Sequence, residues 1–230
     1  MGNIRYNGII KYSTEMVEHD AGYHSGDALY VGESYTNQIG TRDNYMEAAT
    51  SNGTVTDTAA TAEFVLQSGI GVAGYAKLRT ESTKVSVLGP KPTTASFRVR
   101  NVINGAGADR HTVLGLCESA STVPLTAGSS GCYFHQLADD TWLARSNNQG
   151  VDDDNSASVL TIADDDILSV VATNAKAWFY QNGNLVLETK VVDQIPTVAL
   201  GASVGVIATA ATVSTARGIS IRSIQYMRYF

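Results

Sequence analysis

The chain has 230 residues, of which 43% are hydrophobic and 17% charged, and its formal net charge at pH 7 is −6. This composition is typical of a folded protein and excludes a disordered or collagen-like one. The negative charge disfavours a nucleic-acid partner, because phosphate backbones carry the same sign. The sequence begins without the apolar run of a secretion signal and has no stretch of roughly 18 apolar residues, so we expect no export and no membrane helix.

Residues 1–58 carry Tyr, Gly, Asn and Asp with little periodicity and predict an irregular N-terminal arm or subdomain. Asp43 is placed to cap a short helix that includes Met46 and Glu47. Few aliphatic residues accompany the tyrosines, so we expect the arm to be ordered by contact with its own domain or with a neighbouring subunit. Apolar area that stays exposed in a lone subunit favours a homo-oligomer. The tyrosines of this predicted assembly arm are Tyr6, Tyr12, Tyr23, Tyr30, Tyr35 and Tyr45.

Residues 59–230 predict one strand after another, separated by Gly, Asn and Asp turns. Phe97–Ile103 starts with alternating apolar and charged side chains, the pattern of a strand with one buried face. Gly131–Ala138 and Thr141–Ser146 predict a hairpin around the acidic turn Asp139-Asp140. Ile167–Thr173 is apolar on both faces, which is typical of a central strand.

The clearest local signal is the hairpin in Ala177–Lys190, where two apolar runs flank Asn182-Gly183, a pair that tolerates the positive φ angles of a type I′ turn. In the last predicted strand, Ile219 and Ile221 share one phase, whereas Ile224 and Tyr226 share the other. A β-bulge near Arg222-Ser223 would reconcile the two phases. With no helix-period segment between the strands, the sequence predicts an all-β antiparallel β-sandwich, or jelly roll, with an irregular N-terminal arm.

The order of these segments is FRVRNVI, VLGLCES, YFHQLADDTWLARS, ILSVVATNAKAWFYQNGNLVLET, the Pro-containing connector DQIPTVALGASVGVIATAA, and ISIRSIQYMRY. This order resembles the concanavalin A-like lectin/glucanase (laminin-G-like) β-sandwich, in the versions found in bacteriophage structural proteins. The resemblance covers roughly residues 60–230. It implies a sheet, built from the middle strands, whose concave face meets a ligand or a partner.

Acidic residues offer little for catalysis in this sequence. Glycosidases of this fold place carboxylates in an E-x-D-x-x-E strand, and no such run is present. The acidic strings at 139–140, 152–154 and 164–166 fall at predicted turns, where Asp commonly bonds its own backbone. We therefore expect no enzymatic activity.

The sequence supports a metal site less strongly than it supports turns at these acidic residues. Asp152, Asp154 and Asn155 could bind a structural calcium ion, but the loop lacks the Gly and distal Glu of an EF-hand. His19 and His24, with Asp20 and Asp27, could meet in the arm, although an exposed loop explains them equally well. Cys117 and Cys132 have no metal-ligand spacing; they are expected to be reduced, although a bridge between adjacent strands remains open.

Four aromatic residues lie on predicted strands that should be neighbours: Trp142, Trp178, Tyr180 and Tyr133. Core packing is the simplest role for a tryptophan in a sandwich. Trp178 and Tyr180 share a strand face with Lys176, which favours a surface that meets a glycan or a partner protein.

We predict a non-enzymatic virion structural protein, either a capsid decoration or a tail component, that acts through subunit contacts. Its partners would be other virion proteins and copies of itself, and its location the virion, assembled in the host cytoplasm. The alternative is a carbohydrate-binding module or host-receptor adhesin that uses the concave sheet. A hydrolase is the third and least favoured hypothesis.

Overall fold

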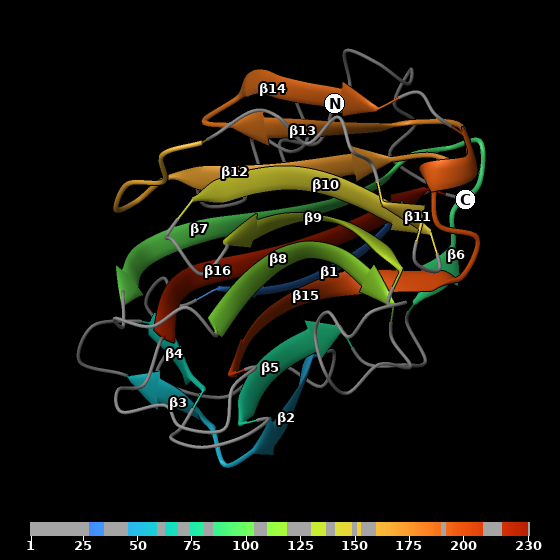
Figure 1. Cartoon of the computed structure of the whole chain (residues 1–230). Coiled ribbons are helices and arrows are strands. Elements are labelled where there is room, and N and C mark those ends of the chain that lie inside the picture. Colours follow the sequence, from blue (N-terminus) through green and yellow to red (C-terminus); the bar gives the residue numbers. More distant parts are fainter. Residues whose placement is uncertain are drawn as a thin grey trace, which may run out of the picture.

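The computed structural model describes residues 28–34, 46–58, 63–68, 74–80, 85–103, 110–118, 130–136, 141–148, 151–152, 160–189, 192–208 and 218–229. Within these ranges the chain forms two antiparallel sheets stacked face to face (Figure 1). This arrangement matches the predicted concanavalin A-like jelly roll, so the predicted fold class is confirmed. No helix among the described residues is long and apolar enough to cross a membrane.

Sheet A runs in the order β14-β13-β12-β7-β16-β4-β3, and β1 also pairs with β16. Its strands are β1 (Ala28–Ser34), β3 (Thr54–Thr58), β4 (Glu63–Gln67), β7 (Thr93–Ile103), β12 (Ile167–Ala172), β13 (Ala177–Gln181), β14 (Asn184–Thr189) and β16 (Gly218–Tyr229). Sheet B runs in the order β11-β10-β9-β8-β15-β5-β2, and β6 also pairs with β15. Its strands are β2 (Met46–Ser51), β5 (Tyr75–Thr80), β6 (Ser86–Val87), β8 (Arg110–Glu118), β9 (Gly131–Gln136), β10 (Trp142–Asn148), β11 (Val151–Asp152) and β15 (Ala199–Ala208). A short 3-10 helix, η2 (Val192–Gln194), precedes β15.

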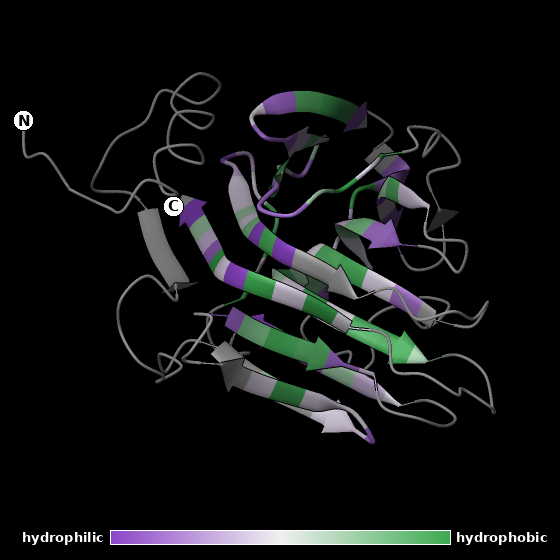
Figure 2. Cartoon of the chain, turned by 90° about the vertical axis from the view of Figure 1, so that its left-hand side faces the viewer, coloured by the Kyte–Doolittle hydropathy of each residue, from purple (hydrophilic) through white to green (hydrophobic). Residues whose placement is uncertain are grey.

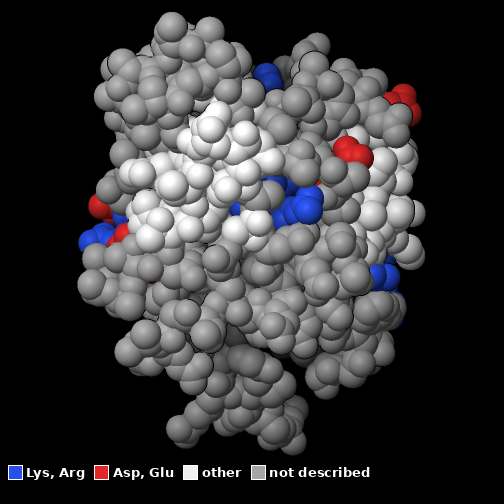
Figure 3. Space-filling model, turned by 90° about the horizontal axis from the view of Figure 1, so that it is seen from below, with Lys and Arg blue, Asp and Glu red and all other residues white. Residues whose placement is uncertain are grey.

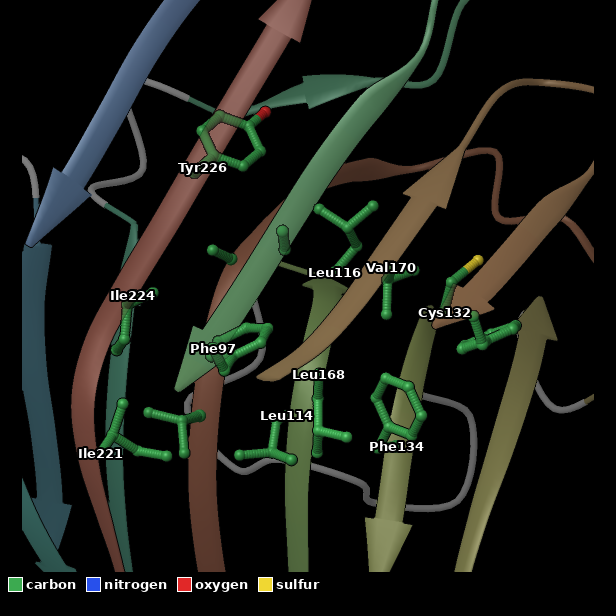
Figure 4. Close-up of a cluster of buried hydrophobic side chains, with 14 of the residues drawn as sticks. Phe97, Leu114, Leu116, Cys132, Phe134, Leu168, Val170, Ile221, Ile224 and Tyr226 are labelled. Carbon is green, nitrogen blue, oxygen red and sulfur yellow. The ribbon is translucent and has the colours of Figure 1, made fainter. Parts of the chain in front are cut away.

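The core lies between the two sheets, because every second side chain of each strand points inward. Figure 2 shows the resulting alternation of apolar and polar segments along the strands. Phe134 of β9 packs edge-on against Phe179 of β13, with ring centroids 5.6 Å apart, so an aromatic pair joins sheet B to sheet A. Phe97, Leu114 and Leu168 fill the neighbouring space (Figure 4).

The predicted hairpin is confirmed as β13–β14. Asn182 and Gly183 have φ angles of 52° and 81°, and positive φ at both central residues is what a type I′ turn requires. Asp166 fixes the base of this turn, because its carboxylate accepts hydrogen bonds from Gln181 Nε2, Asn182 Nδ2 and the backbone N–H of Ala163, at 2.7, 2.7 and 2.8 Å.

The predicted bulge in the last strand is also confirmed. The register of β16 against β7 shifts between Ser220 and Ile221 and again between Ile221 and Ser223. Because of the shifts, Ile219 and Ile221 before the irregularity and Ile224 and Tyr226 after it all join the core, although their sequence phases differ.

Ion pairs neutralise much of the charge on the outer face of sheet A. Asp165 lies within 4 Å of Arg98, Arg100 and Arg222, and its φ of 67° is in the left-handed region that Asp tolerates. Arg100 also pairs with Glu63 at 3.3 Å. The acidic string at 164–166 therefore forms a turn, as predicted, and in addition binds the arginines of β7 and β16.

Part of the predicted arm belongs to the sandwich itself. β1 pairs with β16, β2 with β5 and β3 with β4. The predicted short helix after Asp43 is wrong over Met46 and Glu47, which begin β2; the backbone pairs with β5, and this pairing overrides the local capping signal. Of the arm tyrosines, Tyr30 lies in β1, and Tyr6, Tyr12, Tyr23, Tyr35 and Tyr45 lie outside the described residues. Self-association stays a prediction.

Candidate functional site

The outer face of sheet B, which points away from the core, carries two rows of side chains that cross neighbouring strands. Cross-strand register places Arg145, Tyr133, Gly115, Ser203 and Arg79 side by side on β10, β9, β8, β15 and β5. The next row contains Leu143, His135, Val113, Gly205 and Lys77 in the same strand order. We call the outward residues of these five strands the outer face of sheet B.

Glycines shape the middle of this face around Tyr133. A Cβ atom added at Gly115 would lie 2.7 Å from Tyr133 Cβ, and one at Gly131 would lie 2.8 Å from Tyr133 Cδ1. Both distances are too short for real side chains, so only glycine lets the tyrosine occupy this position. Tyr133 is 2% exposed and clusters with Val113 and Cys117. The face therefore has an apolar, buried centre.

Two histidines meet beside Tyr133. His111 Nδ1 lies 2.8 Å from His135 Nε2, so one ring nitrogen donates a hydrogen bond and the other accepts it. His135 is 5% exposed. Burial, followed by the nearby His111 and Arg145, lowers the pKa of His135 to about 3. His135 is therefore neutral at physiological pH, and His111 is half-buried at the accessible side of the pair.

Several buried polar atoms of this face lack a hydrogen-bond partner among the described residues. They are Arg145 Nε, His135 Nδ1 and Ser203 Oγ. A buried donor or acceptor without a partner typically costs about 1–3 kcal/mol. The three atoms are enclosed, so a ligand on this face would contact the half-buried side chains of His111, Leu143 and Arg145 beside them.

Positive charge gathers on the same face although the whole chain is acidic. Lys77, Arg79 and Arg145 lie on it, and the five strands β10, β9, β8, β15 and β5 bring no Asp or Glu to it. In the flanking strands β2 and β11, register pairs Glu47 with Arg79 and Asp152 with Asn147. Figure 3 views the molecule from below, from the end at which β2, β3 and β5 lie in Figure 1, and shows a group of Lys and Arg atoms near the middle of that side.

The structure does not bring the four candidate aromatics to one surface, which corrects that expectation. Trp142 is 3% exposed and lies in the core, because even-numbered residues of β10 point inward. Tyr133 lies on the outer face of sheet B. Trp178 and Tyr180 lie on the outer face of sheet A, where Lys176 Nζ is 4.2 Å from the Trp178 ring centroid and 3.4 Å from Glu188 Oε1.

The candidate calcium ligands fall largely outside the described residues. Asp152 ends β11, and Asp154 and Asn155 follow it in an undescribed segment, as do His19 and His24 in theirs. No group of three His, Cys, Asp or Glu that could hold a metal ion occurs within the described ranges. Cys117 points outward from sheet B and Cys132 inward, so the alternation of the strands prevents the disulfide that the sequence left open.

No protein-family model and no curated protein matches the sequence. Solved structures do match. The carbohydrate recognition domain of Emp47p has a TM-score of 0.60 at 11% identity, over 91% of this chain and 100% of that one. The fold is that of concanavalin A-like lectins and glucanases. The transglycosylase Crh5 has a TM-score of 0.61 at 10% identity, and the match covers 86% of this chain and 83% of that one. The β-glucanase of Bacillus licheniformis has a TM-score of 0.54 at 14% identity, and the match covers 88% of this chain and 99% of that one.

These matches overturn two predictions. The predicted virion structural role is wrong, because the matched concanavalin A-like structures are carbohydrate recognition domains, glycoside hydrolases and a transglycosylase. The predicted absence of enzymatic activity is contradicted by the same enzymes. The carbohydrate recognition domain of Emp46p also matches, in a potassium-bound form, which is compatible with the bound ion that the sequence left open.

Sequence reasoning missed His111, His135 and Arg145 as neighbours. Each lies in a recognisable strand, so its outward direction was readable from the alternation of its own segment. These side chains meet because β8 pairs with β9 and β9 pairs with β10. The sequence between β8 and β9 contains no recognisable hairpin turn, so it does not predict the register of that pair.

Proposed function

We propose that this protein binds carbohydrate on the outer face of sheet B. The observation that carries the proposal is that polar side chains of neighbouring strands, Arg145 on β10 and His111 on β8, are half-buried rather than enclosed on this face, with His111 hydrogen-bonded to His135 between them. Sugar hydroxyls donate and accept hydrogen bonds, so one ligand can bond both the guanidinium of Arg145 and the imidazole of His111. Half-buried His111, Leu143 and Arg145 are the accessible residues at which a saccharide would first make contact.

Two further observations support the proposal. On sheet A the arginines are paired with Asp164, Asp165 and Glu63, so that their charges are already compensated within the protein. Known structures with the same sandwich include carbohydrate recognition domains and glucanases, which makes a glycan the ligand class to test first.

The test is a retention screen of the full chain on immobilised neutral and acidic polysaccharides, with the release of reducing ends measured on the same panel. We expect saturable binding to at least one glycan. The His111→Ala variant should bind that glycan about tenfold more weakly, because a lost hydrogen bond in a desolvated site has roughly this effect. Release of reducing ends would extend the proposal from binding to hydrolysis.

Trp178→Ala serves as the control, since Trp178 lies on the other sheet and its loss should leave binding unchanged. Thermal unfolding of both variants shows whether each is folded. The proposal is wrong if the folded wild-type chain is retained on no glycan, or if His111→Ala binds as well as the wild type.

A further inference from the structure

His135 lies between Arg145 and His111 on the outer face of sheet B. We propose that Arg145 fixes the tautomer of His135 and that His135, as a positioning residue, thereby makes His111 a hydrogen-bond donor toward the ligand; the last step rests on the proposed function. His135 is 5% exposed, so its effect on a ligand passes through the half-buried His111.

The strand register places the two neighbours at opposite corners of His135. Val113 of β8 lies opposite His135, and His111, two residues earlier in β8, is a diagonal neighbour. Leu143 of β10 lies opposite His135 on the other side, and Arg145, two residues later in β10, is the other diagonal neighbour. Because both pairings are antiparallel, His111 is displaced toward the end of β9 and Arg145 toward its start. Long side chains at such diagonal positions are within reach of each other.

The two ring nitrogens of His135 face these two neighbours. Nε2 lies 2.8 Å from His111 Nδ1. The nitrogens of an imidazole ring point in nearly opposite directions, so Nδ1 of His135 faces the side of Arg145. This Nδ1 has no hydrogen-bond partner among the described residues, and Arg145 Nε is likewise enclosed without one. Arg145 is also among the groups that lower the pKa of His135, after burial and His111.

The charge of Arg145 decides where the neutral ring of His135 carries its proton. A proton on Nδ1 would leave two enclosed donors, Nδ1–H and Arg145 Nε–H, on the same side without an acceptor, and such donors are costly. A proton on Nε2 leaves a bare Nδ1, whose lone pair is stabilised by the positive guanidinium.

The tautomer of His135 in turn sets that of His111. With its proton on Nε2, His135 donates to His111 Nδ1, and a neutral His111 then holds its own proton on Nε2. A ligand atom that reaches this nitrogen therefore has to accept a hydrogen bond, as the oxygen atoms of a sugar do.

Nitrogen NMR of the ligand-free full chain, labelled at its histidines, tests the tautomers, because a protonated and a bare ring nitrogen have clearly different chemical shifts. The chain has four histidines, and the spectra of His111→Gln and His135→Gln assign the two signals. At neutral pH we expect the proton on Nε2 of both residues. A proton on Nδ1 of either residue in the major form would overturn the inference.

The variant Arg145→Met removes the charge and keeps an unbranched side chain. The ratio of the two His135 tautomers should shift about tenfold toward Nδ1–H, because the lone pair loses its interaction with a charged group. Arg222→Met is the matched control: it removes the same charge from the outer face of sheet A, where Arg222 pairs with Asp165 at 3.0 Å, and should leave the ratio unchanged. No shift in Arg145→Met, or an equal shift in both variants, would show that Arg145 does not fix the tautomer.

Two replacements of His135 test the effect on the ligand, measured with the glycan that the wild type retains best. His135→Leu leaves His111 without its donor and should weaken binding about tenfold. His135→Gln keeps an amide N–H that can donate to His111 Nδ1 and should bind within about threefold of the wild type. Thermal unfolding shows whether both variants are folded. Wild-type binding by folded His135→Leu, or equal losses in the two variants, would contradict the positioning role.

The outcomes separate this inference from the proposed function. If the chain is retained on no glycan, the proposed function is wrong, and nitrogen NMR of the ligand-free chain still decides the tautomers. If the chain binds a glycan but His135 carries its proton on Nδ1, this inference is wrong and carbohydrate binding stands.

Discussion

Replacement of Phe134 by alanine is expected to lower the free energy of unfolding by about 3–5 kcal/mol, the usual range for removing a buried phenylalanine. Phe134 is fully buried and its ring meets that of Phe179 at an interplanar angle of 88°. The two residues belong to different sheets, so alanine leaves a cavity at the contact that joins them. Urea denaturation of the wild type and the variant measures the loss.

Two controls make this result specific to the sandwich core. Leu185→Ala removes a side chain that is 52% exposed and should change the free energy of unfolding by less than about 0.5 kcal/mol. A double-mutant cycle with Phe179→Ala should show a coupling of about 0.5–1.5 kcal/mol for the aromatic pair. If Phe134→Ala unfolds at the same urea concentration as the wild type, the two sheets do not pack as described.

The second large effect is the dependence of stability on pH that arises from His135. Its pKa is about 3 in the folded protein and near 6.5 in the unfolded chain. Between these values the unfolded chain binds a proton that the folded protein does not, so acidification favours unfolding. The contribution of this residue to the free energy of unfolding is fully present above pH 6.5 and decreases as the pH falls toward 3. Linkage gives a loss of about 2 kcal/mol between pH 8 and pH 5.

His135→Gln tests this directly, because glutamine is polar but does not titrate. Carboxylates elsewhere in the chain also titrate as the pH falls, so the informative quantity is the difference between wild type and variant at each pH. We expect the wild type to lose about 2 kcal/mol more than His135→Gln over that interval. Parallel profiles would mean that His135 is accessible to protons in the folded protein.

The sequence predicted the sandwich well because its strands carry their own signals. Asn182-Gly183 fixes a turn by its tolerance of positive φ, and the change of phase between Ile221 and Ile224 indicates a bulge. Neither signal needs information from distant parts of the chain. The N-terminal strands were harder, since β2 and β3 are rich in Ala and Thr and gain their place only by pairing with β5 and β4.

The site could be predicted only in part. Tyr133 was chosen for its aromatic ring, and it does lie at the centre of the face, but it is buried among glycines that carried no functional signal. Trp178 and Tyr180 were expected beside it and lie on the other sheet, because local alternation says which face of a strand a side chain occupies and not which sheet the strand joins. The sequence also does not show which charged residues pair with one another, because the partners come from different strands. Asp165 and the three arginines around it are an example.

The central claim is that the outer face of sheet B binds carbohydrate, and a crystal structure of the chain with the oligosaccharide that it retains best tests it most directly. We predict sugar density across β10, β9, β8 and β15, within hydrogen-bond distance of Arg145 and His111. Density over Trp178 and Tyr180 on sheet A instead, with none on sheet B, would contradict the claim.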